Sequence, residues 1–487
     1  MTSVPVDIAP PGWRALLGRA HGAVVITLAG GVGLHATNVY LATTVMPSVV
    51  ADIGGARLYA WATTVFVVAS VLGSATAGAL LAHSGPRWAY RWSALVLVAG
   101  TVICALSPTM GVLLIGRAAQ GFGGGLLFAL CYSIVRVALD ESLWPRAMAL
   151  VSAMWGVATL IGPALGGIWA QLAMWRGAFW MLIPVLLLFL VWGAGRLPSA
   201  SQQQGRVRIP WAAVGLLTAS ALVISVASVS DSLPVNAAGL AGAGGLLALW
   251  LRHERTAAVR VLPAAAFGPD RRLRLVYITM SLLVIASSVE VFVPYFGQHL
   301  QGLSPLEAGY FGAAMAAGWT AGSLLFSGVS ARRGLLIGLA PVSCVLGLAI
   351  LVTAGPAATR APAILLIIIT GLVLLGGGIG AVFPHLLTDV FQLAGDRDQD
   401  LAGSSATIVQ LTATAFGSAL AGTVANLAGF ADPAATAHAA RWLFAIFLVP
   451  AVLAWPASHL IRRTRPAIDP RAGHRQRGGT VDRGRVE

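Results

Sequence analysis

The strongest constraint on this chain is a run of about twenty apolar residues with few or no charges, which recurs from about position 21 to about position 461. A helix of this length crosses roughly 30 Å of hydrocarbon at ~1.5 Å per residue. Hydrophobic residues make up 57% of the chain and charged residues 10%, which is far from the composition of a soluble domain. We therefore predict an all-α integral membrane protein with about fourteen transmembrane helices.

The charges of the short loops predict the orientation of the chain. Arginines such as Arg87 and Arg146 collect on one side of the predicted spans. The other side carries little beyond Arg57, Arg176, Arg360 and Arg441. Cytoplasmic loops carry the excess of basic residues, so both termini are expected in the cytoplasm, in a multi-pass protein of the cell membrane. Topology thus accounts for the formal charge of +14, and nucleic acid is not an expected partner. We expect a monomer.

Two polar stretches, 199–208 and 252–274, interrupt the rhythm of spans and enclose two helices that read as an inserted pair. Removing the pair leaves six spans on either side. The tail is rich in glycine and arginine, which predicts disorder and a weak attraction to anionic membrane lipids. The predicted organisation is a cytoplasmic N-terminus (1–20), an N-terminal six-helix bundle (21–195), a linker with two inserted helices (196–272), a C-terminal six-helix bundle (273–461) and a basic cytoplasmic tail (462–487).

Several motifs carry a resemblance to a known family. The sequence RAAQGFGG begins at Arg117 in the fourth span, GPALGG begins at Gly162 in the fifth, Trp175 and Arg176 precede the sixth, and GLSPLEAG begins at Gly302. On these motifs the chain resembles the major facilitator superfamily, and within it the fourteen-helix drug:proton antiporter group, over nearly its whole length. The resemblance implies the major facilitator fold of two six-helix bundles plus two inserted helices. It also implies secondary active transport by alternating access, with a proton gradient as the energy source and no cofactor.

The motif residues also have a physical interpretation. Gly162, Gly166 and Gly167 allow helix backbones to approach closely, and Pro163 bends its helix, so we interpret this motif as a conformational element. Small residues pack transmembrane helices in general, which is the structural alternative. In SPLE, Ser304 and Glu307 predict a capping box at a helix start, a structural role.

The departures from the family pattern concern its acids. Between the second and third spans the chain has Gly78 and Gly85, but Ala82 stands where the family has an acid. The corresponding loop of the second half, 328–334, has Arg332 and Arg333 and no carboxylate. In the first span the acid that this group often carries falls on Asn38. We interpret His385 and Asp389 as solvated residues at the cytoplasmic end of a span.

Arg117 and Glu290 are the two clear charges within predicted spans. A charge at the centre of a transmembrane helix costs ~2.5 to 3.5 kcal/mol on insertion scales, so both are functional candidates. We hypothesise that Glu290 carries the coupling proton and releases it when Arg117, from the opposite bundle, approaches. The alternative is a static ion pair or a substrate-binding carboxylate. His35, at a similar depth, is a candidate to share the proton, with a neutral hydrogen-bonded histidine as the alternative.

Other residues are candidates to line a cavity that binds substrate. They are polar or aromatic and lie within predicted spans, where packing or interface anchoring is the alternative role for the tryptophans. These candidates are Asn38, Gln120, Tyr295, Gln410, Trp155 and Trp319. The three cysteines have no metal-like spacing and are read as packing residues, so no metal site is predicted.

The leading function is therefore proton-coupled export of amphiphilic or drug-like small molecules. An uptake symporter or a facilitator on the same fold is the alternative, because the missing acids weaken the antiporter interpretation. A membrane-embedded enzyme or a channel is a third class. We find no metalloprotease motif, nucleophile elbow, phosphate-binding loop or ring of like charges in the sequence, so we do not expect an enzyme.

Overall fold

The computed structural model describes residues 13–19, 21–198, 208–329, 333–395 and 398–463. Within these ranges the secondary structure is helical, without a β-strand. Twelve segments are long and apolar enough to cross a membrane, so the predicted all-α membrane class is confirmed. Most of the predicted terminal segments 1–20 and 462–487, most of the polar link 199–208, and Arg332 lie outside the described residues.

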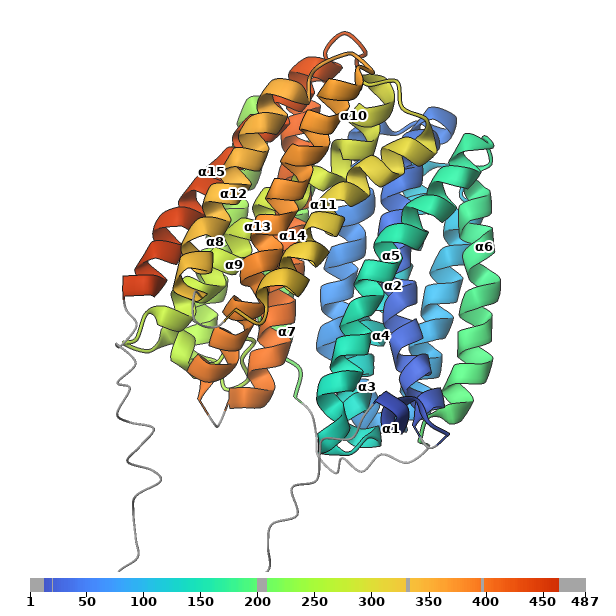
Figure 1. Ribbon diagram of the computed structural model, residues 1–487, viewed down its shortest axis with the longest axis vertical. Helices are drawn as coiled ribbons and strands as arrows, with labels where there is room; N and C mark the ends of the chain where they lie inside the picture. The colour runs from blue at the N-terminus through green and yellow to red at the C-terminus, as the bar shows by residue number, and fades with distance from the viewer. Residues whose placement is uncertain (1–12, 20, 199–207, 330–332, 396–397, 464–487) are drawn as a thin grey trace, which may run out of the picture.

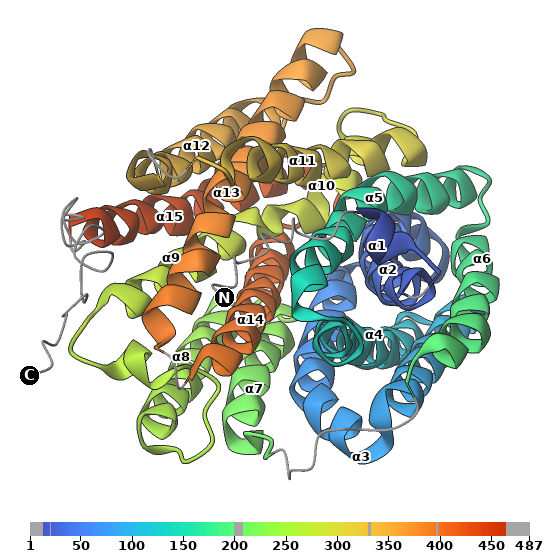
Figure 2. The same ribbon diagram turned by 60° about the horizontal axis from the view of Figure 1, so that its bottom comes forward.

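Two bundles stand side by side, one built from the early and one from the late part of the chain (Figures 1 and 2). The first bundle follows the short helix α1 (Trp13–Leu17) and contains α2 (Gly22–Ile53), α3 (Trp61–Leu106), α4 (Met110–Ala138), α5 (Trp144–Gln171) and α6 (Trp175–Leu188). The second bundle contains α9 (Arg272–Ser287), α10 (Val293–His299), α11 (Pro305–Phe326), α12 (Arg333–Ala354), α13 (Pro362–Ala394), α14 (Gln399–Leu427) and α15 (Thr436–Arg463). Between them in sequence lie α7 (Trp211–Ser228) and α8 (Leu233–Thr256).

Helix α3 consists of two arms that run in opposite directions on either side of Gly85. Gly85 has φ 72° and ψ 168°, a backbone conformation that glycine adopts without steric penalty. One arm runs parallel to α4 and the other antiparallel, as the close contacts Phe66 with Gly121 and Ser70 with Gly125, then Ser93 with Gly123 and Cys104 with Gly116, establish. The twelve membrane segments count α3 once and do not include α11. A total of fourteen crossings remains a prediction.

The inserted helix α7 contacts both bundles, since it packs against α3 and α14. The indole nitrogen of Trp61 donates to the carbonyl oxygen of Ser225 at 2.9 Å. Arg57 forms an ion pair of 2.5 Å with Asp231 in the turn between α7 and α8. Helix α7 is therefore fastened to the first bundle while it also lies against α14 of the second.

Close backbone contacts hold the helices of the second bundle together. A Cβ at Gly376 would lie 1.8 Å from the carbonyl oxygen of Met315, and a Cβ at Gly380 would lie 2.0 Å from that of Trp319. Only glycine lets α13 lie this close to α11. Because lipid tails are as apolar as these helices, such packing contributes more to their association than hydrophobic burial does.

The capping box predicted from the sequence is present at the start of α11. The backbone nitrogen of Ser304 donates to Glu307 Oε2 at 2.8 Å, and the backbone nitrogen of Glu307 donates to Ser304 Oγ at 3.4 Å. Glu307 also pairs with Arg360 at 2.6 Å. Glu307 thus has the structural role that the sequence predicts.

Candidate functional site

Arg117 on α4 is the buried charge of the first bundle, with 2% of its surface exposed. Its Nη1 donates hydrogen bonds to Asn38 Oδ1 at 2.5 Å and to Gln120 Oε1 at 2.8 Å. Its Nε donates to the carbonyl oxygen of Ala62 at 3.1 Å, and its guanidinium lies 4.2 Å from the centre of the Phe66 ring. Neutral oxygens and an aromatic face solvate this cation, and no ion pair among the described residues compensates it.

Asn38 and Gln120, predicted to line a substrate cavity, are the partners that orient Arg117. Both are buried. The amide nitrogen of Gln120 donates to Thr101 Oγ1 at 3.0 Å, which turns its oxygen toward Arg117. The amide nitrogen of Asn38 is buried without a hydrogen-bond partner. The fourth-span motif therefore holds the cationic side chain of Arg117 inside the bundle. The amide nitrogen of Asn38 beside it is a donor without an acceptor.

His35 lies beside this site, in an aromatic environment. Its ring centre is 5.4 Å from that of Phe66 and 5.6 Å from that of Phe128, and its Nδ1 has no hydrogen-bond partner. Gly124 of the RAAQGFGG motif accommodates the imidazole, since a Cβ there would lie 2.4 Å from Nδ1. Trp155 lies against His35 with ring centres 6.1 Å apart. The structure thus brings together three of the predicted residues, His35, Trp155 and Arg117, around Phe66 and Phe128.

Glu290 lies where the ninth span is interrupted. The sequence predicts one continuous helix, but the structure has a 3₁₀ turn, Ser288–Phe292, between α9 and α10. Pro294 is the cause, because it has no N–H to donate to the carbonyl of Glu290 four residues earlier, and its ring would crowd that carbonyl. The backbone nitrogen of Val293 donates there instead.

Pro294 and Gly297 lie against α11, and α10 also packs against α2 of the first bundle, the helix that carries Tyr40. Glu290 is partly buried, and its carboxylate forms no hydrogen bond or ion pair within the described ranges. No ion pair joins it to Arg117 among the described residues. Tyr40, which sequence reasoning missed, also lies 6.5 Å from Trp155 between ring centres. Tyr40 and Trp155 thus connect the surroundings of Glu290 and His35.

The other predicted cavity residues lie elsewhere. Trp319 packs on Phe383 within the second bundle, with ring centres 5.3 Å apart. Gln410 is partly buried on α14, and its side chain forms no hydrogen bond with the described part of the chain. Gly78 lies in the first arm of α3, before the reversal at Gly85.

Tyr295 belongs to an aromatic cluster that joins the two bundles. Tyr59 of the first bundle is 1% exposed, and its ring lies 4.9 Å from Phe292, 5.5 Å from Tyr295 and 5.9 Å from Phe430 between centres. The Tyr295 hydroxyl donates to the carbonyl oxygen of Phe430 at 3.3 Å, and the Tyr59 hydroxyl is buried without a partner. This outer aromatic cluster, Tyr59, Phe292, Tyr295 and Phe430, closes the contact between the bundles at one end.

The GPALGG motif brings α5 against helices of both bundles. A Cβ at Gly162 would lie 2.5 Å from the Cβ of Tyr40, and one at Gly166 would lie 2.9 Å from the carbonyl oxygen of Leu41, both on α2. A Cβ at Gly167 would lie 2.5 Å from the Cα of Leu306 on α11, in the opposite bundle. Pro163 lies beside Gly309, which is also on α11. These small residues therefore let α5 pack against α2 of the first bundle and against α11 of the second, near the outer aromatic cluster.

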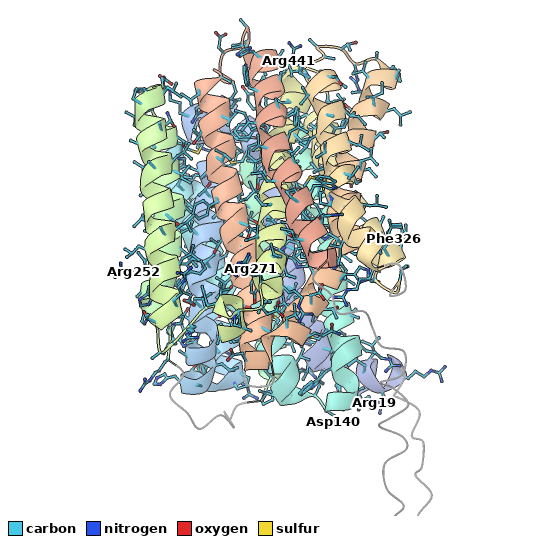
Figure 3. The ribbon with its side chains drawn as sticks, turned by 90° about the vertical axis from the view of Figure 1, so that its left-hand side faces the viewer. Arg19, Asp140, Arg252, Arg271, Phe326 and Arg441 are labelled. Atoms are coloured by element: carbon cyan, nitrogen blue, oxygen red, sulfur yellow. The ribbon has the colours of Figure 1, made fainter. Side chains whose placement is uncertain are left out.

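The described hydrogen bonds between the bundles join Tyr310 to Leu160 and Asn426 to Arg57. Arg441 lies at the same end of the molecule as α10 (Figures 1 and 3), and we call this the α10 end. The ribbons of the bundles converge there and diverge toward the end that holds α1 (Figure 1). This conformation is thus closed at the α10 end.

The second-half loop has a carboxylate partner after all. Arg333 forms an ion pair of 2.6 Å with Asp389 of α13 and donates to the carbonyl oxygen of His385 at 2.6 Å. The ring nitrogen Nε2 of His385 lies 3.0 Å from the carbonyl oxygen of Phe326. The interpretation of His385 and Asp389 as solvated residues is wrong, because both are buried and the arginine compensates the carboxylate. Only the fold brings these distant residues together.

Known proteins are similar to this chain in sequence and in fold. A family model described as Major Facilitator Superfamily matches residues 28–422. The chain is 40% identical over 473 residues to a probable multidrug-efflux transporter of Mycobacterium tuberculosis, covering 93% of this chain and 97% of the relative. It is 26% identical over 268 residues to the multidrug efflux pump SdrM of Staphylococcus aureus, covering 54% and 59% of the two chains. A crystal structure of a peptide transporter POT in complex with sulfate superposes with a TM-score of 0.67 at 14% identity, covering 93% and 97%.

Proposed function

Because this chain belongs to the major facilitator superfamily of transporters, we propose that it exports amphiphilic, drug-like small molecules in exchange for protons. Membership makes it a multi-pass membrane transporter of small molecules rather than an enzyme. The relatives named as multidrug-efflux proteins support the substrate class and the direction.

Two opposite charges in opposite bundles carry the proposal of proton coupling. Arg117 is held by Asn38 and Gln120 in the first bundle, and Glu290 lies unpaired in the interrupted span of the second. Neither charge has a described counter-ion, so each favours a conformation that brings the other nearer. A proton on Glu290 removes that attraction. Protonation and the relative position of the bundles are then coupled.

The interruption at Pro294 supports the same role for Glu290. An unbroken helix carries its side chains in fixed directions, whereas the 3₁₀ turn Ser288–Phe292 lies between two helical pieces, α9 and α10. A movement of α10 relative to α9 would change the surroundings of Glu290 directly. Phe292 in the same turn belongs to the outer aromatic cluster, so opening the α10 end would also move the turn that holds Glu290.

In this proposal the α10 end faces the outside and both termini face the cytoplasm of a cell membrane, in accordance with the loop arginines. The conformation closed at the α10 end would receive substrate from the inside. Opening the outer aromatic cluster and closing the α1 end would release it outside. The transporter works as a monomer surrounded by lipid.

A flux assay in proteoliposomes tests the exchange. Purified protein is reconstituted with ethidium, a cationic aromatic dye, inside the vesicles, and a pH jump imposes a proton gradient of either sign. Dye efflux should accelerate when protons flow inward and not when they flow outward. Acceleration with protons moving in the same direction as the dye would establish the alternative, a symporter, and independence from the gradient would establish a facilitator.

A further inference from the structure

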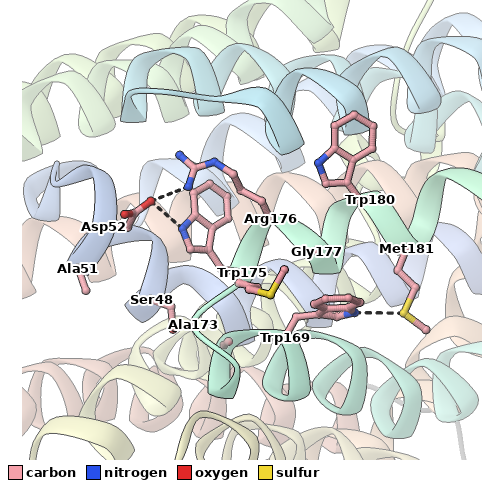
Figure 4. Close-up of a pocket in the computed structure, with 12 residues that line it drawn as sticks. Ser48, Ala51, Asp52, Trp169, Ala173, Trp175, Arg176, Gly177, Trp180 and Met181 are labelled. Atoms are coloured by element: carbon pink, nitrogen blue, oxygen red, sulfur yellow. Dashed lines mark hydrogen bonds and ion pairs between the residues drawn. The ribbon is translucent and has the colours of Figure 1, made fainter.

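A pocket of about 970 Å³ opens at the α10 end of the first bundle, between the end of α2, the end of α5 and the start of α6 (Figure 4). Its lining is mostly apolar and aromatic, and it includes the ion pair of Asp52 and Arg176. The residues proposed for proton coupling, Glu290, Arg117 and His35, are not part of it. The pocket is therefore a separate site.

The charged pair in this pocket is held in place but remains open on one side. Asp52 Oδ2 accepts hydrogen bonds from Arg176 Nη1 at 2.6 Å and from Trp175 Nε1 at 3.0 Å (Figure 4). Arg176 Nη2 donates to the carbonyl oxygen of Ser107 at 2.9 Å, and the guanidinium lies 4.2 Å from the centre of the Trp175 ring. The side chains of Arg176 and Asp52 are still 38% and 50% exposed. A ligand can reach both charges, and an exposed pair of this kind contributes little stability that the ligand must replace.

The rim of the pocket has more hydrogen-bond donors than acceptors. The Trp180 side chain is 46% exposed, and its indole nitrogen has no hydrogen-bond partner among the described residues. The indole nitrogen of Trp169 meets only the sulfur of Met181, at 3.1 Å, and a thioether is a weak acceptor. With the guanidinium of Arg176 these groups favour a ligand with several acceptor oxygens. Asp52 Oδ1, which accepts no described hydrogen bond, suits a cationic amine.

The surface around this pocket favours a ligand that comes from the lipid bilayer. Helix α6 lies at the periphery of the molecule (Figure 2) and exposes large apolar side chains along its length, including Val185 and Leu188. Trp180, near the start of this helix, is exposed, and exposed tryptophans at helix ends are typical of the level of lipid headgroups. Ala51, Met174 and Met181 offer apolar surface next to the charged pair, where glycerol and the first acyl carbons would lie.

We propose that this pocket binds the headgroup of a zwitterionic phospholipid that carries a primary amine. The phosphate accepts hydrogen bonds from Arg176 and the tryptophan indoles, and the ammonium pairs with Asp52. Phosphatidylglycerol, whose headgroup is anionic, lacks the amine that Asp52 requires. A choline headgroup has a cation but no N–H to donate to the carboxylate.

Native mass spectrometry of the detergent-solubilised protein tests the proposal with three lipids of identical acyl chains: phosphatidylethanolamine, phosphatidylcholine and phosphatidylglycerol. The wild type should retain phosphatidylethanolamine about tenfold better than the other two, the ratio expected for one additional charge-assisted hydrogen bond. Arg176→Gln should weaken retention of phosphatidylethanolamine, and Asp52→Asn should remove the preference over phosphatidylglycerol. Arg441→Gln, at the same end on α15, is the matched control and should retain lipid like the wild type.

The ion pair also connects α2 to α6, so a pocket-filling variant separates lipid binding from stability. Ala51→Trp leaves Asp52 and Arg176 in place and should reduce lipid retention while the melting temperature without lipid stays that of the wild type. Equal retention of the three lipids by the wild type, or wild-type retention by Ala51→Trp, would overturn the proposal. Glycerophosphoethanolamine that displaces the lipid at equal concentration would also overturn it, because the ligand would then be a soluble molecule. None of these readouts depends on transport.

Discussion

Asn38 of α2 accepts a hydrogen bond of 2.5 Å from Nη1 of Arg117 on α4. In the fourteen-helix antiporters that this chain resembles, an acid often occupies the position of Asn38. The amide oxygen orients the guanidinium as a carboxylate would, but it leaves the positive charge uncompensated. In the proposed mechanism, the charge of Arg117 attracts Glu290 from the opposite bundle.

Asn38→Asp should therefore weaken proton coupling and stabilise the fold. A carboxylate at this position would pair with Arg117 and reduce its attraction for Glu290, while a buried cation would gain a counter-ion. We expect the stimulation of dye efflux by a pH gradient to fall about tenfold, which corresponds to ~1.4 kcal/mol, and the melting temperature to rise. Initial rates in proteoliposomes and a thermal unfolding curve measure the two effects. Undiminished stimulation in this variant would contradict the role given to the charge of Arg117.

Glu290→Gln should abolish acceleration by the proton gradient but allow exchange of labelled dye across the membrane without a gradient. The amide keeps the shape of the side chain and cannot release a proton. Glu307→Gln is the matched control, because Glu307 is a carboxylate of the same bundle engaged in a capping box. Gln also completes a capping box at this position, so this variant should keep both its cap and its response to the gradient. If the Glu290 variant still responds fully to the gradient, another group carries the proton.

Tyr59→Ala should shift the protein toward a conformation open at the α10 end, because it removes the first-bundle ring from the outer aromatic cluster. Tyr59→Phe keeps the ring and removes a buried hydroxyl that has no partner, so it should preserve the closed conformation and its stability. Leu106 and Ala431 are exposed positions, one on each bundle. Spin labels at these two positions would report the distance between the bundles by pulsed electron paramagnetic resonance. The alanine variant should gain a population at longer distance that the phenylalanine variant lacks. Identical distributions would mean that the cluster does not hold the end closed.

Gly124→Ala should destabilise the first bundle, and His35→Ala should relieve the effect. The added methyl would lie 2.4 Å from His35 Nδ1, so helix α2 or the imidazole must move. A double-mutant cycle measured by unfolding should show coupling on the order of 1 to 2 kcal/mol. Gly111→Ala, on the same helix with only Thr109 within 4.0 Å, should change stability by less than ~0.5 kcal/mol. Additive effects of the Gly124 and His35 substitutions would show that the two residues do not restrain each other.

The apolar runs were sufficient to predict the class of fold, because each helix must span hydrocarbon whatever its neighbours are. The capping box at Ser304 was also predictable, since all its groups lie within four residues. The break at Glu290 had a local signal, Pro294, that an assumption of one continuous helical period concealed.

The partners of the buried charges could not be predicted from the sequence. Asn38 and Arg117, like Arg333 and Asp389, lie on different helices, and nothing in their sequence spacing sets their distance. Their pairing depends on the angle and depth at which two helices pack. Tyr40 was missed for the same reason, because its place at the contact between α2 and α10 depends on the packing of the bundles.

Helix α7 has a consequence for the symmetry of the molecule. It lies against both α3 and α14, whereas α5 and α11 meet directly through glycines and a proline. The two lateral faces along which the bundles adjoin are therefore not equivalent. On the face formed by α3 and α14, helix α7 covers the contact between the bundles. A molecule dissolved in the bilayer would therefore have to pass between membrane and interior through the face formed by α5 and α11.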